Sequence, residues 1–88
     1  MITMKEIAEQ ELEHEPWTLH DIRGPYRQAK LVRVRDRILY RARMETHHSY
    51  PAIGRFFRRD HSSVHVAVQR EEARRQSSKE NGSGHAST

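Results

Sequence analysis

Two short helical patterns on either side of a tight turn constrain the fold of this chain more than any other feature. Ser49 can cap a helix over about residues 50–57 that has Pro51 in its first turn, and Asp60 can cap the helix that follows. The two patterns have apolar sides made of Ile53, Phe56, Phe57, Val64, Ala67 and Val68. Two helices joined by so short a turn predict a helix-turn-helix over residues 49–76.

The preceding residues also have helical patterns. Thr3 and Glu6 fit a capping box that starts a helix over about residues 4–14. Thr18 can cap a short helical turn, and a long amphipathic helix is predicted from about residue 26 to residue 45. The inward face of this long helix carries Leu31, Val34, Ile38 and Ala42, and its outward face carries Arg33, Arg37 and Arg41. We therefore predict an all-α fold, a small bundle of four to five helices.

Length and composition limit the classes of protein to which this chain can belong. The 88 residues suffice for one small domain, predicted over residues 1–76, and residues 77–88 have the composition of a disordered polar tail. The chain has no cysteine, which excludes disulfides and thiolate zinc sites. It has no apolar run of membrane-spanning length and no secretory signal, so we expect a cytoplasmic protein without membrane association.

Charge is distributed unevenly along the chain. Residues 1–22 contain one lysine and six acidic residues, a net charge of −5. Residues 23–59 contain eleven basic and two acidic residues, a net charge of +9. Residues 60–88 contain equal numbers of basic and acidic residues. This asymmetry indicates a surface in the middle of the chain that binds a polyanion, although a solvated basic helix would have the same composition.

Residues 59–67 read Arg-Asp-His-Ser-Ser-Val-His-Val-Ala and resemble the signature of the C-terminal DNA-binding domain of DnaA, the bacterial replication initiator. Residues 49–54, Ser-Tyr-Pro-Ala-Ile-Gly, are similar to the helix before that signature, and the resemblance covers roughly residues 4–76. It implies a stand-alone helix-turn-helix domain whose recognition helix starts at Asp60 and enters the major groove of double-stranded DNA.

The resemblance also implies roles for individual side chains. His61 and Ser62 hold the positions that contact bases in the major groove, and Arg27 holds the position of a basic loop that enters the minor groove. Val66 and Gln69 are further candidates for base contacts. The complete predicted DNA-binding set is Arg27, Lys30, Arg33, Ser49, Arg55, Arg58, Arg59, Asp60, His61, Ser62, Ser63, Val66 and Gln69.

Two positions depart from the family pattern. Val66 stands where the family has a second reading histidine, and His65 lies one residue earlier, about 100° away around a helix. The turn before the recognition helix is one residue shorter and carries an added arginine. We predict sequence-specific binding by a small bacterial or phage regulator of transcription or replication initiation, associated with the nucleoid. The alternative is a protein-interaction or non-specific DNA-binding module that has lost sequence reading.

Other chemistry is less favoured by the sequence. His61 and His65 have a zinc-binding spacing, but no third ligand accompanies them. Asp60, His61 and Ser62 are the residue types of a hydrolase triad, yet neighbours on a helix point about 100° apart. We therefore expect no enzyme activity, cofactor, metal or small-molecule substrate. A homodimer or a protein partner bound through the acidic helix over residues 4–14 stays open.

Overall fold

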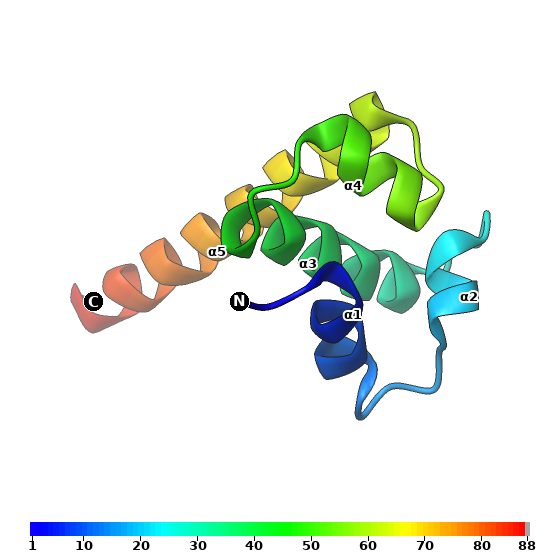
Figure 1. The fold of residues 1–88 in the computed structure, drawn as a ribbon. Coiled ribbons are helices and arrows are strands. Elements are labelled where there is room, and N and C mark those ends of the chain that lie inside the picture. The colour runs from blue at the N-terminus through cyan, green and yellow to red at the C-terminus, as the bar shows by residue number, and fades with distance from the viewer. Residues whose placement is uncertain (88) are drawn as a thin grey trace.

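Helix α3 (Ala29–Glu45) is the centre of the fold, and the other helices lie around it (Figure 1). They are α1 (Met4–Leu12), α2 (Leu19–Arg23), α4 (Tyr50–Phe57) and α5 (His61–Ser87). The computed structural model describes the backbone of residues 1–87 and the side chains of residues 1–77. Helices α4 and α5 pack against one side of α3 and α1 against the other, as Figure 1 shows. The described part of the chain contains no strand, and the all-α prediction is confirmed.

Side-chain caps fix where the helices begin. Glu6 N–H donates to Thr3 Oγ1 and Thr3 N–H to Glu6 Oε1, each at 3.1 Å, which confirms the predicted capping box of α1. Thr18 caps α2, and the Ser49 hydroxyl accepts the N–H of Ala52 at the start of α4. The caps satisfy backbone donors that have no partner within their own helix. These helix starts therefore follow from local sequence.

The apolar face predicted for α3 forms the centre of the core. Leu31, Val34, Ile38 and Ala42 are all at most 2% exposed. The other helices add the buried apolar side chains Met4, Ile7, Ala8, Ile22, Ile53, Phe57, Val64, Ala67 and Val68. Burial of this apolar surface is the main favourable term that holds the helices together.

Three predicted helix ends are corrected by the structure. Helix α3 starts at Ala29 rather than near residue 26, since backbone carbonyls of the preceding loop accept hydrogen bonds from Arg35 instead of continuing a helix. Helix α1 ends at Leu12 rather than near residue 14, close before Pro16. Helix α5 continues to Ser87, past the predicted end near residue 76, in a segment without proline.

The division of the chain into a domain over residues 1–76 and a disordered tail over residues 77–88 stays a prediction. Residue 88 lies outside the described residues, as do the side chains beyond Ser77. None of the helices in the described part of the chain is long and apolar enough to cross a membrane.

Two of the three arginines predicted to point outward from α3 have partners on α1. Arg37 Nε is 2.9 Å from Glu11 Oε1, and Arg41 Nη1 is 3.1 Å from Glu11 Oε2. Arg41 also pairs with Glu45 at 2.7 Å. Only Arg33 is exposed as predicted. The basic row of α3 is therefore divided between an ion-pair contact with α1 and an exposed arginine, Arg33, near the start of the helix.

Candidate nucleic-acid interface

The turn between α4 and α5 is held by a close backbone contact. Arg58 has left-handed backbone angles, with φ 55° and ψ 47°, and its N–H and that of Arg59 both donate to the carbonyl of Gly54. A Cβ at Gly54 would meet the carbonyl oxygen of Arg59, so the turn requires glycine at that position. The side chain of Asp60 accepts the N–H of Ser62 at 3.2 Å, as predicted for a cap of α5.

Helix α5 presents a polar surface on the side away from the core. Val64, Ala67 and Val68 are at most 3% exposed and face inward. At about 100° per residue, Ser62, Val66 and Gln69 lie opposite them, and all three are exposed. Val66 is 52% exposed, so its apolar side chain faces solvent on this surface.

His65 is packed differently from its neighbours on α5. Its ring meets the ring of Tyr50 edge to face at 5.1 Å, and the guanidinium of Arg43 lies 4.6 Å from the centre of the Tyr50 ring. His65 thus contacts the start of α4 while Val66 faces solvent. The geometry agrees with the sequence argument that His65 does not replace the histidine missing at position 66.

Two arginines fasten the loop after α2 to the rest of the molecule. Arg35 donates from Nε to the carbonyl of Ile22 at 3.0 Å and from Nη2 to that of Tyr26 at 2.9 Å. Arg59 donates from Nη2 to the carbonyls of Ile22 and Gly24. Because Arg59 belongs to the turn before α5, these bonds hold the loop that carries Arg27 beside the helix-turn-helix.

The result is an open pocket of about 400 Å³ with four guanidinium groups, which we call the arginine pocket. It is lined by Pro25, Arg27, Val32, Arg35, Arg59 and Arg70. Burial and the neighbouring charge of Arg59 lower the pKa of Arg35 to about 10, and burial and the charge of Arg27 lower the pKa of Arg59. Like charges gathered in this way favour an anionic occupant.

Arg70 is fixed at the edge of the arginine pocket by a buried carboxylate. Its Nε and Nη2 donate to the two oxygens of Asp36, at 2.7 and 3.0 Å, while the Asp36 side chain is only 1% exposed. Arg74 makes a third contact with Asp36 at 2.8 Å. This bidentate bond stabilises the charged form of Arg70 and raises its pKa. It also ties the middle of α5 to α3.

Comparison with known proteins agrees with this geometry. Residues 4–70 match the family described as "Bacterial dnaA protein helix-turn-helix", and this stretch is most of the chain. The chain belongs to that family. No curated protein and no solved structure matches it. Membership in the DnaA helix-turn-helix family makes this a DNA-binding domain, and it confirms the resemblance inferred from residues 49–67.

The predicted DnaA-type residues lie on the loop after α2, the start of α3, α4 with its flanking residues, and the first part of α5. All of them are exposed except Arg59, which is half-buried because it bonds to the loop carbonyls. They are Arg27, Lys30, Arg33, Ser49, Arg55, Arg58, Arg59, Asp60, His61, Ser62, Ser63, Val66 and Gln69. Their individual contacts with DNA stay predictions.

Sequence reasoning missed two arginines of the arginine pocket. Arg35 lies beside the apolar stripe of α3 and is 7% exposed, and Arg70 comes one turn after Val66 on α5. Neither position differs in pattern from an ordinary solvated arginine. Among the described residues, no group of three or more histidine, aspartate or glutamate side chains is placed to hold a metal ion.

Proposed function

We propose that this DnaA-family domain binds double-stranded DNA in a sequence-specific way and regulates transcription or replication initiation, acting at the nucleoid. Helix α5 lies in the major groove, and the loop that carries Arg27 lies over the adjacent backbone or minor groove. The observation that supports this most strongly is the bonding of Arg59 to the loop carbonyls, which joins the two contact regions into one surface.

Base reading is assigned to the exposed face at the start of α5. His61 and Ser62 supply hydrogen-bonding groups there, and Gln69 can pair with an adenine edge. Val66 is 52% exposed and can make an apolar contact with a thymine methyl. The substitution of a histidine by Val66 predicts a preferred site that differs from the family's usual box at the position this side chain reaches.

Phosphate contacts are assigned to the groups that surround the reading face. They come from Ser49, Ser63, Arg55, Arg58 and Arg59 around the turn and from Arg27, Lys30 and Arg33 at the loop and the start of α3. We add Arg35 and Arg70 to this set, because they line the same pocket as Arg27 and Arg59. A phosphate in the arginine pocket would offset the mutual repulsion of its guanidinium groups and raise the lowered pKa of Arg35.

The direct test is fluorescence anisotropy of the whole chain with two duplexes, one carrying the DnaA family's box and one with that sequence scrambled, each titrated across salt. We expect tighter binding to the box, with a difference that persists at physiological salt while total affinity falls for both duplexes. Equal affinity for the two duplexes, followed by no enriched site in a random-sequence selection, would contradict sequence reading and leave a non-specific DNA-binding module.

His61→Ala tests the assignment of the reading face. We expect a loss of about 1–3 kcal/mol on the preferred duplex and a much smaller loss on random DNA, since a base contact discriminates and a phosphate contact does not. His47→Ala is the matched control, because His47 is an exposed histidine in the connector before α4. If the preference survives His61→Ala unchanged, the assignment of His61 to base reading is wrong.

A further inference from the structure

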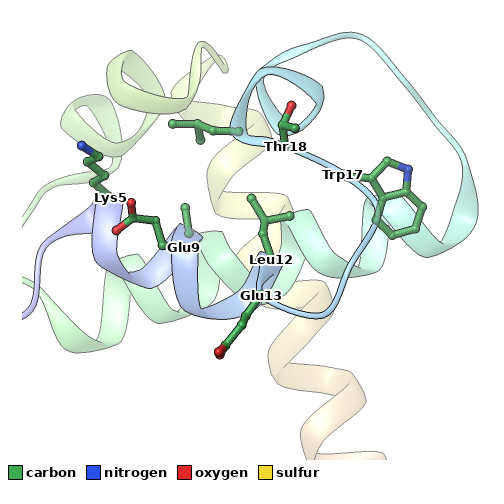
Figure 2. A pocket seen from close by; sticks show the side chains of 8 residues that line it. Lys5, Glu9, Leu12, Glu13, Trp17 and Thr18 are labelled. Atoms are coloured by element: carbon green, nitrogen blue, oxygen red, sulfur yellow. The ribbon is translucent and has the colours of Figure 1, made fainter.

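A second hollow lies on the opposite side of α3 from the helix-turn-helix. It is an open groove of about 310 Å³ between α1 and the segment that leads into α2, and Figure 2 shows it at close range. We call it the α1 groove. Its lining consists of Lys5, Ala8, Glu9, Leu12, Glu13, Trp17, Thr18 and Leu19. The volume is at the lower end of that of ligand-binding clefts.

The floor and one wall of the α1 groove are apolar. Ala8 is 1% exposed, whereas Leu12, Trp17 and Leu19 pack against the core and are only partly buried. An indole with two aliphatic neighbours that remain partly in contact with water is the kind of surface that anchors one large apolar side chain of a partner. In Figure 2, Leu12 projects from α1 into the space below Thr18.

The other wall carries a regular row of charges. Lys5, Glu9 and Glu13 recur every four residues, so they lie along one face of α1. None of these three forms an ion pair with any residue whose side chain is described, whereas Glu11 on α1 and Glu15 just after it pair with Arg37. The row therefore places one positive and then two negative charges beside an apolar groove, none of them in an ion pair with a described side chain.

The charge of this region argues against nucleic acid as the occupant. Residues 1–22 have a net charge of −5, which repels phosphate. We propose that the α1 groove binds an amphipathic helix of a partner protein that places an apolar side chain against Trp17. Alongside it, an acidic residue of the partner lies opposite Lys5, and two basic residues lie opposite Glu9 and Glu13, each four residues from the next.

The position of the α1 groove makes this interaction compatible with DNA binding. Helix α1 lies across α3 from α4 and α5, as Figure 1 shows, so the partner helix and a duplex occupy different sides of the molecule. The partner would thus be held next to the DNA site that the domain occupies. The groove itself is independent of whether the domain reads sequence.

The test uses Trp17, which is the only tryptophan of the chain and lines the groove. The probes are synthetic amphipathic helices of about 15 residues, since shorter isolated helices are marginal in water. The first peptide has a face of leucines and, beside it, one acidic and then two basic residues spaced four apart. The second peptide has these three charges inverted, and the third has the leucines replaced by serine. Trp17 emission is titrated with each peptide without DNA and then with a saturating duplex.

Two variants supply the controls. Lys5→Glu with Glu9→Lys and Glu13→Lys inverts the row on α1, and Glu72→Lys changes an exposed residue of α5 that forms no ion pair with the described side chains. We expect saturable binding of the first peptide, a loss of roughly tenfold or more in the inverted variant, and no change beyond about twofold with Glu72→Lys. The peptide with inverted charges should bind the inverted variant, which shows that the variant is folded.

Three results would overturn the proposal. They are equal binding of the first two peptides to the unmodified chain, no saturable change of Trp17 emission with any peptide, and sedimentation evidence that a second copy of this chain covers Trp17. Since the titration is first done without DNA, its outcome is separate from that of the anisotropy test on the two duplexes.

Discussion

The two sides of α3 are held by different forces. On the side of α4 and α5, Phe57 and Val64 are fully buried, and the buried carboxylate of Asp36 on α3 pairs with Arg70, whose own side chain is 46% exposed. On the side of α1, apolar contacts are supplemented by ion pairs of Glu11 that remain partly exposed to water. The difference teaches that the DNA-binding side is packed to fix the direction of its side chains, while the α1 side leaves apolar surface unfilled.

The largest expected contrast is between two core truncations. Phe57→Ala should lower the free energy of unfolding by about 3–5 kcal/mol, because it removes a fully buried ring from beside α5. Leu12→Ala, in a half-buried position at the α1 groove, should cost about 1 kcal/mol. Urea denaturation followed by circular dichroism measures both, and similar losses would show that the two sides are equally well packed.

The next largest difference in stability is expected between alanine substitutions at two glycines. A Cβ at Gly54 would meet the backbone oxygen of Arg59, so Gly54→Ala should cost about 1–3 kcal/mol by displacing the turn. A Cβ at Gly24 would meet the ring of Tyr26 at 2.6 Å, but that ring is 47% exposed and can move away. Gly24→Ala should therefore be nearly neutral. Thermal unfolding of the two variants measures the difference, and a reversed order would refute the close packing of the turn.

Arg58→Gly is expected to raise the stability of the domain and to weaken its binding to DNA. Glycine adopts the left-handed conformation of residue 58 without the steric cost of a Cβ, so the variant should gain about 0.5–1 kcal/mol in free energy of unfolding. Loss of the guanidinium should weaken binding to every duplex. It should also reduce the slope of log affinity against log salt concentration by about one unit, as expected for the loss of one phosphate contact. Denaturation and anisotropy on the same sample check both, and unchanged salt dependence would remove Arg58 from the phosphate contacts.

The smallest expected effect is at the contact between α1 and α3. Glu11→Gln breaks pairs with Arg37 and Arg41 that are partly exposed, so it should cost less than about 1 kcal/mol, and less again at high salt. Glu9→Gln, which breaks no described ion pair, is the control and should be neutral. A cost above that of Gly54→Ala would mean that electrostatics, rather than apolar burial, attaches α1.

Local features were predictable from the sequence since they depend on residues a few positions apart. The caps at Thr3, Ser49 and Asp60 and the inward stripe of α3 were predicted and are confirmed, because capping and helical periodicity act within one or two turns. The family signature over residues 59–67 was recognisable for the same reason. It is short and continuous in the chain.

The arrangement of charges was decided by tertiary structure alone. Arg35, Arg37 and Arg41 have similar positions in the sequence of α3, yet Arg35 is buried beneath the loop while Arg37 and Arg41 pair with Glu11. Apart from the Arg41–Glu45 pair within α3, their partners lie on other elements, nine or more residues away in the chain, and a solvated arginine has the same pattern. The sequence thus determined the helices, the core face and the family, while packing determined which cations remain exposed, since charges are neutralised or gathered only by neighbours in space.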